Sequence, residues 1–233
     1  EISACLVGSE MCIRDRPDLV ILPGSKNTIG DLKWLRESGM EAAIKRFAID
    51  NPVFGICGGY QMLGMQIDDP EQTEEGGSIR GMELLPIRTV LKLQKQTRQV
   101  TGTFDKVAGI FSCLSGQSIR GYEIHMGETM AVDAIKPLCH LDQKNDVVCQ
   151  ERDGGQRDNV YGTYVHGIFD DKDVAYDLCR LLAEKKGLTL QAEADTDYQS
   201  FKESQYDLLA EGIRKSMDMD CLLYTSDAAD DRI

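Results

Sequence analysis

A short segment, GICGGYQMLG at residues 55–64, constrains the fold of this chain more than any other. An apolar run at 53–56 leads into Cys57, two glycines follow, and an apolar helical pattern then begins. Glycine permits a sharp backbone turn that a Cβ atom would obstruct. A strand, a sharp turn with a nucleophile at its apex and a helix form the elbow of many hydrolases, here with cysteine in place of serine. The segment therefore predicts an α/β fold in which Cys57 is a nucleophile.

We expect the backbone around Cys57 to serve this chemistry. The N-terminus of the following helix favours a thiolate and lowers the pKa of the thiol. The N–H of Gly58 can face the oxyanion that forms when a thiolate attacks a carbonyl. Such a Cys57 is expected to react with alkylating agents fastest of the eight thiols. The alternative is a buried structural cysteine in a glycine-rich turn, but the combination of strand, flanking glycines and helix favours the nucleophile.

The residues before the elbow predict a parallel sheet with helical crossovers. Residues 17–24, PDLVILPG, read as a short buried strand that ends in a turn. Cap residues at 25–28 begin a helix that continues through 31–36, and a second helical pattern follows at 40–49. The strand at 53–56 then completes a strand–helix–strand order with short connections, which is typical of parallel α/β sheets.

After the elbow, the pattern changes to a β-rich excursion and then to helices. The acidic run at 68–77 predicts a solvated loop rather than a metal site. The predicted strands of the excursion cover residues 84–91, 99–104, 121–127 and 147–150. Basic residues at 92–98 predict a small surface hairpin between the first two. Helices are expected over 174–186 and 200–217, with the apolar residues of the second facing a core.

Composition excludes several classes of protein. Lys and Arg total 26 against 39 Asp and Glu, and the net charge of −13 argues against a partner with a phosphate backbone. No apolar run approaches the roughly 20 residues that cross a bilayer, and no signal peptide is recognisable. The eight cysteines have no zinc-type spacing and there are only three histidines, so no metal site is expected. We therefore expect a cytoplasmic protein with reduced thiols and with neither nucleic-acid nor membrane partners.

Both ends of the sequence lack a clean secondary-structure period. Residues 1–16 and 221–233 resemble translated adapter read-through of the kind found in assembled environmental sequences. We therefore expect them to be non-native and assign a single domain to residues 17–220.

A second chemical cluster, NVYGTYVHGIFD, occupies residues 159–170. Its β-branched and aromatic residues predict a strand that delivers His166 to its end, where catalytic residues gather in open parallel sheets. Paired with Cys57, His166 is the leading candidate for a general base. His125, inside a predicted strand, is a rival with a structural or substrate-side role, and His140 is expected in a surface loop.

Four segments together resemble the glutamine amidotransferase domain of the cobyric acid synthase family, over residues 17–220. They are LPGSKNT at 22–28, GICGGYQ at 55–61, GYEIHMG at 121–127 and YVHGIFD at 164–170. The elbow alone indicates only a class I glutamine amidotransferase, and the segments at 22–28 and 121–127 narrow the resemblance. It implies a flavodoxin-like, mostly parallel sheet flanked by helices, with a β-rich excursion.

The resemblance also implies roles for individual residues. Cys57 attacks the side-chain amide of L-glutamine and His166 is its partner. The residues expected to form the oxyanion hole or to lie near the bound glutamine are Gly24, Ser25, Gly58 and Gln61.

The sequence departs from the wider class I pattern in three respects. Most class I enzymes place a glutamate two residues after the catalytic histidine, where this chain has Ile168. Glu123 and Asp170 are the remaining candidates to orient His166. The family's larger ATP-binding synthetase domain has no counterpart here, and no Walker motif occurs. The family's amidotransferase domain has a first strand and helix before the position of residue 17. We expect both to be missing from this chain, which then resembles a fragment of a longer protein.

In the whole enzyme, the resemblance implies that ammonia passes to an ATP-activated carboxylate of a corrin. This transfer amidates adenosylcobyrinic acid a,c-diamide stepwise, in cobalamin biosynthesis. This chain is expected to hold no cofactor, since ATP and magnesium belong to the synthetase domain, and to show weak or uncoupled glutaminase activity. The alternatives are a relative that amidates cobyrinic acid or a cell-wall lipid intermediate, and a non-catalytic docking module.

Overall fold

The computed structural model describes residues 17–190 and 198–218, which belong to two units that we describe separately. The first unit contains every strand of the described residues and the helices up to α6 (Lys172–Lys185). The second contains α7 (Tyr198–Ser216). The expectations for residues 1–16 and 221–233 lie outside the described residues.

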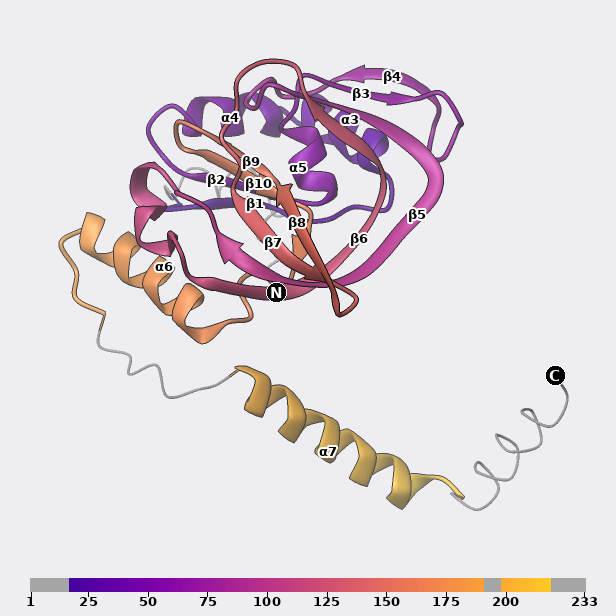
Figure 1. Cartoon of the computed structure of the whole chain (residues 1–233), viewed down its shortest axis with the longest axis vertical. Coiled ribbons are helices and arrows are strands. Elements are labelled where there is room, and N and C mark those ends of the chain that lie inside the picture. Colours follow the sequence, from indigo (N-terminus) through magenta and orange to yellow (C-terminus); the bar gives the residue numbers. More distant parts are fainter. Residues whose placement is uncertain (1–16, 191–197, 219–233) are drawn as a thin grey trace, which may run out of the picture. The chain divides into compact units, whose positions relative to one another are not determined.

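The smaller sheet confirms the predicted parallel α/β order (Figure 1). Its strands, in spatial order, are β1 (Val20–Leu22), β2 (Val53–Ile56), β10 (Val160–Thr163) and β9 (Gly155–Arg157). The first three are parallel, and β9 runs antiparallel to β10. Two helices, α3 (Thr28–Glu37) and α4 (Met40–Phe47), connect β1 to β2. The side chain of Asn27 caps α3 by accepting a hydrogen bond from the N–H of Gly30 at 3.1 Å.

Alternation along the strands of this sheet directs side chains into two hydrophobic clusters. Val53 and Val160 pack with α3 and α4 on one face, whereas Phe54 and Tyr161 pack with α6 on the other. A sheet covered on both faces explains why β2 reads as a continuous apolar run in the sequence.

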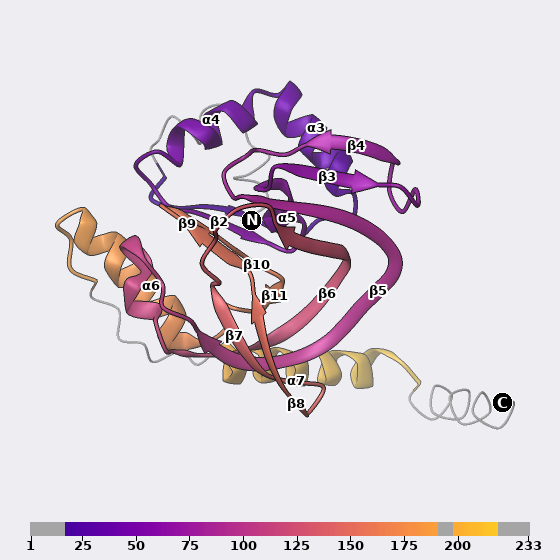
Figure 2. The same cartoon turned by 45° about the horizontal axis from the view of Figure 1, so that its top comes forward.

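The excursion forms the larger sheet, which is antiparallel except where β3 runs parallel to β5. Its main path, in spatial order, is β11 (Val165–His166), β6 (Ser118–Ala131), β5 (Ile87–Phe104), β3 (Gln66–Asp69) and β4 (Gly77–Arg80). Two further strands, β7 (Cys139–Lys144) and β8 (Val147–Asp153), continue from β5. A 3₁₀ helix, η1 (Gly109–Leu114), lies between β5 and β6. Figure 2 shows β5 and β6 as long curved arms beside the smaller sheet.

The predicted hairpin at 92–98 is wrong, because residues 87–104 form one continuous strand. The register between β5 and β6 shifts between Val90 and Lys95, which is a β-bulge. The polar residues that suggested a turn lie in or next to this bulge, and β5 pairs with β6 on both sides of it.

The prediction of a solvated loop at 68–77 is also wrong in part. Asp69 is buried and accepts hydrogen bonds from three backbone N–H groups and one hydroxyl of the loop that follows. The carboxylate of Glu74 accepts a hydrogen bond from the N–H of Ile29 in the first turn of α3, at 2.9 Å. These acidic side chains satisfy backbone donors of a turn and of a helix N-terminus.

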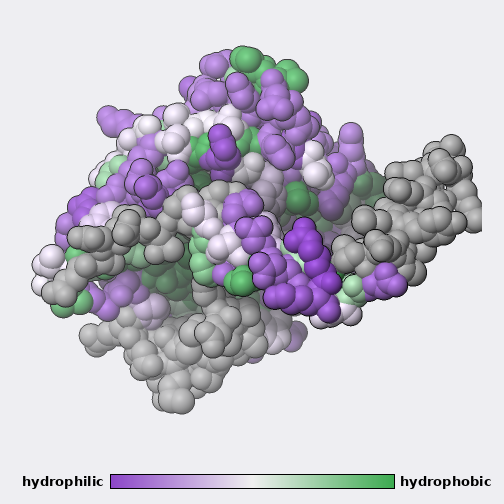
Figure 3. All heavy atoms as spheres, turned by 90° about the horizontal axis from the view of Figure 1, so that it is seen from below, coloured by the Kyte–Doolittle hydropathy of each residue, from purple (hydrophilic) through white to green (hydrophobic). Residues whose placement is uncertain are grey.

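The surface of the described residues is consistent with the acidic composition. On the face drawn in Figure 3, most of the coloured surface is hydrophilic. The side chains of α7 that were predicted to face a core are exposed, namely Phe201, Tyr206, Leu208, Leu209 and Ile213. Among residues 17–190 and 198–218, no helix is long and apolar enough to cross a membrane.

Close packing of the elbow against β1 predicts that Gly59→Ala destabilises the first unit. A methyl group at Gly59 would lie 2.1 Å from the carbonyl oxygen of Leu22, where neither backbone can give way. We expect a loss of about 3 kcal/mol in the free energy of unfolding. The measurement is urea unfolding followed by the fluorescence of Trp34, the single tryptophan, which lies on α3.

Gly212→Ala is the matched control, because nothing lies within 4 Å of the added methyl group. It should leave the Trp34 transition unchanged. An unfolding midpoint for Gly59→Ala equal to that of the wild type would contradict the close packing of the elbow.

Candidate active site

The turn at Cys57 is strained and is held by both neighbouring strands. Cys57 has φ 53° and ψ −109°, and a positive φ is uncommon for a residue with a side chain. Its N–H donates to the carbonyl of Thr163 at the end of β10, at 2.8 Å. The N–H of Gly59 donates to the carbonyl of Pro23 just after β1, at 3.0 Å. The predicted elbow is therefore present.

The surroundings of Cys57 favour the protonated thiol. Its Sγ donates a hydrogen bond to the carbonyl oxygen of Ile124 in β6, at 3.3 Å. Burial raises the pKa of Cys57 to about 11, and the opposing effect of the Gly58 N–H is smaller. The predicted lowering of this pKa is therefore wrong for the unliganded protein. The helix that follows, α5 (Gly58–Met62), has only five residues, and desolvation outweighs its N-terminus.

His166 lies at the end of a strand, as predicted, and its imidazole is half-buried. That strand, β11, does not belong to the parallel sheet, as the sequence suggested, but pairs antiparallel with β6 in the larger sheet. The ring of His166 stacks on that of Tyr122, with centroids 5.2 Å apart and planes 3° from parallel. Burial lowers the pKa of His166, and a hydrogen bond to the backbone of Ile124 raises it in part. Nε2 is buried and has no hydrogen-bond partner among the described residues. A neutral imidazole with a free Nε2 is suited to accept a proton.

The structure brings the predicted oxyanion residues to the same place. A methyl group on Gly24 would lie 3.0 Å from Cε1 of His166 and 3.7 Å from Cβ of Cys57. A methyl group on Gly58 would lie 2.8 Å from the backbone nitrogen of Ser25. The turn after β1 and the start of α5 therefore meet beside the thiol and the imidazole.

Gln61 is buried, and its side chain links three elements. Its Oε1 accepts a hydrogen bond from Thr28 at 3.3 Å. Its Nε2 donates to the carbonyl of Met126 at 3.2 Å and to the hydroxyl of Tyr164 at 3.1 Å. Gln61 thus joins the start of α3 to β6 and to the segment that carries His166.

Neither carboxylate considered for orienting His166 contacts the imidazole among the described residues. Glu123 is buried beside Lys144 at 3.1 Å and pairs across the strands with Val165. It therefore points to the face of β6 opposite Tyr122. The carboxylate of Asp170 lies near Gly167, whose added methyl group would be 3.2 Å from Oδ2.

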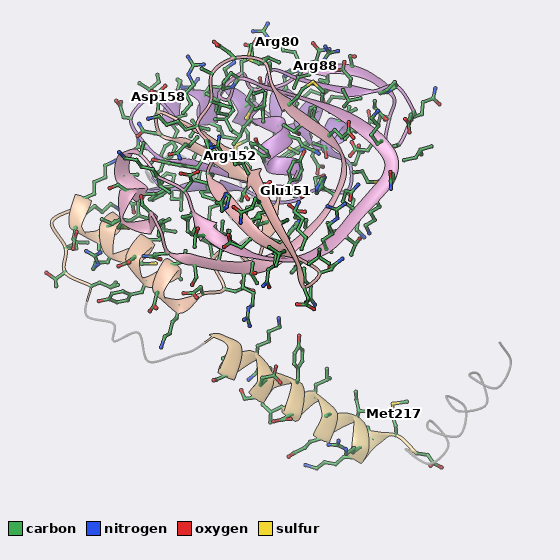
Figure 4. The ribbon with its side chains drawn as sticks, viewed as in Figure 1. Arg80, Arg88, Glu151, Arg152, Asp158 and Met217 are labelled. Carbon is green, nitrogen blue, oxygen red and sulfur yellow. The ribbon has the colours of Figure 1, made fainter. Side chains whose placement is uncertain are left out.

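A polar cavity of about 360 Å³ is lined by residues of the larger sheet and of the segments around it, and neither Cys57 nor His166 belongs to its lining. Its charged lining residues are Arg98, Glu123, Glu128, Lys144, Arg152 and Asp153. Arg152 lies on β8 next to Glu151 (Figure 4). His125 also lines the cavity and stacks on Tyr164 at 3.9 Å, and burial lowers its pKa.

The prediction that His140 lies in a loop is wrong. His140 lies in β7, where its Nε2 is 3.0 Å from Oε1 of Gln150. Among the residues that the structure describes, no group of three or more potential ligands could hold a metal ion.

Asp153 is a buried carboxylate that the sequence did not reveal. Its Oδ2 accepts hydrogen bonds from the Thr163 hydroxyl and from the N–H of Tyr164, the latter at 3.1 Å. Thr163 is also the residue whose carbonyl holds Cys57. Burial raises the pKa of Asp153 to about 6.

Three contributors to the site escaped sequence reasoning. The carbonyl of Ile124 is a backbone group, so no side-chain type could have revealed it. Tyr122 lies in the GYEIHMG segment, and pairing of that strand with the strand of His166 was the signal that could have found it. Asp153 follows a weak strand pattern that carries no such signal.

Comparison with known proteins identifies the domain type. The sequence profile of the CobB/CobQ-like glutamine amidotransferase domain matches residues 6–174. A protein named cobyric acid synthase from Ruminiclostridium cellulolyticum is 47% identical over 206 residues, which are 88% of this chain and 40% of that protein. Another of that name, from Lachnoclostridium phytofermentans, is 45% identical over 87% of this chain and 41% of its own length. The chain thus spans about two fifths of these relatives.

Among solved structures, PurLQS from Thermotoga maritima resembles this fold with a TM-score of 0.52 and 17% identity. The match covers 74% of this chain and 81% of that one. It supports the α/β fold.

The raised pKa of Asp153 predicts a pH-dependent penalty on stability. The folded protein binds this proton more tightly than the unfolded chain does. The stabilisation that protonated Asp153 gives the folded protein is therefore fully present below the ordinary pKa of 3.8. It is lost as pH rises through about 6, where the buried carboxyl group ionises. Asp153→Asn cannot ionise, and an amide oxygen in place of Oδ2 keeps both hydrogen bonds. Relative to wild type, its free energy of unfolding should rise by about 2 kcal/mol between about pH 4 and pH 7.

Urea unfolding at a series of pH values measures this difference. Asp158→Asn is the matched control, because its side chain is 87% exposed (Figure 4). A difference between Asp153→Asn and wild type that does not change with pH would contradict burial of an ionisable carboxyl group.

The raised pKa of Cys57 predicts slow alkylation of the unliganded chain. At neutral pH, iodoacetamide should modify the exposed thiol of Cys179 well before Cys57, whose rate climbs only as pH approaches about 11. Peptide mass spectrometry resolves the individual thiols, and a urea-denatured sample supplies the intrinsic rates. If Cys57 reacts first in the folded chain, it is already activated without substrate.

Proposed function

The chain belongs to the CobB/CobQ-like glutamine amidotransferase family, and from this premise we propose that Cys57 and His166 hydrolyse the side-chain amide of L-glutamine to release ammonia. The observation that carries the proposal is the strained elbow, which presents Cys57 beside Gly24 and the imidazole of His166. Strain of this kind is found at reactive positions, where the surrounding structure compensates for it.

The first half of the reaction forms a thioester. Substrate binding draws the thiol away from the carbonyl of Ile124, and Nε2 of His166 takes its proton. The thiolate then attacks the carboxamide carbon, and the carbonyl oxygen becomes an oxyanion. The backbone N–H groups of Gly58 and Ser25, which lie together beside Cys57, donate hydrogen bonds to this oxygen. When the oxyanion collapses, the carbon–nitrogen bond breaks and the proton on His166 leaves with ammonia.

The second half returns the enzyme to its starting state. His166, again neutral, removes a proton from a water molecule, which attacks the thioester carbon. The carbon–sulfur bond breaks, glutamate leaves, and the proton passes from His166 to the sulfur. A low pKa for the imidazole keeps it neutral at the start of both halves.

We extend the proposal to the whole protein of which such a domain is part. The names of the relatives at 47% and 45% identity support a role in cobyric acid synthesis. Ammonia then passes to a synthetase domain, which uses ATP and magnesium to amidate the carboxylates of adenosylcobyrinic acid a,c-diamide in cobalamin biosynthesis. We place this reaction in the cytoplasm, where a catalytic thiol stays reduced. These names favour this assignment over amidation of cobyrinic acid or of a cell-wall lipid.

The proposal predicts that Cys57→Ala and His166→Ala each abolish the release of glutamate from glutamine. Removal of the nucleophile or the base should lower kcat by about a thousandfold or more. The assay is enzymatic detection of glutamate with the purified chain, and Trp34 fluorescence checks that each variant is folded.

Cys179→Ala and His140→Gln are the matched controls, because both residues lie outside the site, on α6 and β7. Both should keep the wild-type rate. A Cys57→Ala variant that releases glutamate as fast as the wild type would overturn the proposed function.

A further inference from the structure

His166 has no carboxylate where class I enzymes place one. The corresponding residue, Ile168, is apolar and buried in the hydrophobic cluster that also contains Val165 and Phe54. Glu123 is engaged by Lys144 on the other face of β6. Something else must therefore hold the imidazole in the orientation that the reaction requires.

The strand β6 lies directly against His166. In the antiparallel pairing of β6 with β11, His166 is opposite Tyr122. The two backbones approach closely, because a methyl group on Gly121 would lie 2.1 Å from the carbonyl oxygen of His166. Directly opposed residues on one face of a sheet place their side chains in contact. The parallel stack of Tyr122 on the imidazole is the result of this register.

The next part of β6 supplies a hydrogen-bond acceptor. The carbonyl of Ile124 accepts the Sγ–H of Cys57 and also interacts with the imidazole N–H. A carbonyl oxygen has two lone pairs, so one group can serve both donors. The ring of His166 is thus covered by Tyr122 on a face, interacts with the backbone of Ile124, and lies against Gly24 at Cε1.

We propose that Tyr122 is a positioning residue for His166, whose flat ring fixes the plane of the imidazole while the Ile124 carbonyl accepts its N–H. Together they replace the carboxylate of the class I pattern. Unlike a carboxylate, neither group adds a negative charge, so the imidazole keeps the low pKa that burial gives it. The proposal deepens the function assigned above, because it explains how the same His166 is aligned with Cys57.

Among residues 17–190 and 198–218, no charged group is a cause of the pKa shift of His166. The elbow contributes the thiol of Cys57, β6 contributes Tyr122, and the segment after β11 contributes Asp170, beside Gly167. Arg120 shares the face of β6 with Tyr122 and is exposed. None of these charges is a cause of the lowered pKa of His166, which follows from burial. Removing the ring that covers the imidazole should therefore raise this pKa toward the ordinary value of about 6.5.

The test compares Tyr122→Ala with Tyr122→Phe in the full chain. NMR titration of the imidazole follows the pKa of His166 directly and requires no turnover. The chain has three histidines, and loss of a signal in His166→Gln identifies the relevant one. Tyr206→Ala, which removes an exposed tyrosine of α7, is the control. Because Tyr122 is 45% exposed, its replacement is expected to leave the chain folded, which Trp34 fluorescence verifies.

We expect Tyr122→Ala to raise the pKa of His166 and to lower kcat for glutamine hydrolysis by about 10- to 100-fold, with little change in KM. The acidic limb of the pH–rate profile should move to higher pH with it. Tyr122→Phe keeps the ring and should retain both wild-type values, as should Tyr206→Ala.

Several results would overturn the positioning role. They are an unchanged His166 pKa in Tyr122→Ala, a raised pKa with unchanged kcat, and a Tyr122→Phe variant as impaired as Tyr122→Ala. If the wild-type chain releases no glutamate, the proposed function fails, yet the titration still decides whether Tyr122 covers and holds His166.

Discussion

The positive φ of Cys57 is the constraint on which the rest of the site depends. A residue with a side chain persists in this conformation only where its surroundings hold it there. Here β10 fixes Cys57 through the carbonyl of Thr163, and β1 fixes Gly59 through Pro23. The glycines are required because α5 packs directly on β1, with no room for a methyl group at Gly59. Two parallel strands and a tightly packed helix thus determine where the sulfur lies.

The two sheets contribute different parts of the site. The smaller sheet supplies the nucleophile, since Cys57 follows β2, and it carries Thr163, which binds Asp153 at the end of β8 in the larger sheet. The larger sheet supplies the environment of the imidazole, because β11 pairs with β6 rather than continuing β10. The long strands of the excursion therefore form part of the site, because β6 pairs with the strand that carries His166.

The sequence allowed prediction of those features that depend on local pattern. The strand before Cys57, both helices between β1 and β2, and the strand of His166 follow from apolar runs, caps and glycines. Features that depend on tertiary contacts were not predictable in this way. The polar residues near Lys95 form a bulge because β6 pairs on both sides of it, and Asp69 is buried because a loop folds around its carboxylate. The pKa of Cys57 was predicted in the wrong direction, because the extent of burial cannot be read from the residues around it.

The most direct test of this account is to look for the covalent intermediate. The chain is mixed with glutamine, quenched in acid during turnover, digested and mapped by mass spectrometry. The account predicts a glutamyl group on the peptide that contains Cys57 and on no other cysteine, and its absence from His166→Ala, in which the thiol lacks a proton acceptor. Release of glutamate without any adduct on Cys57, at a rate that Cys57→Ala retains, would contradict it.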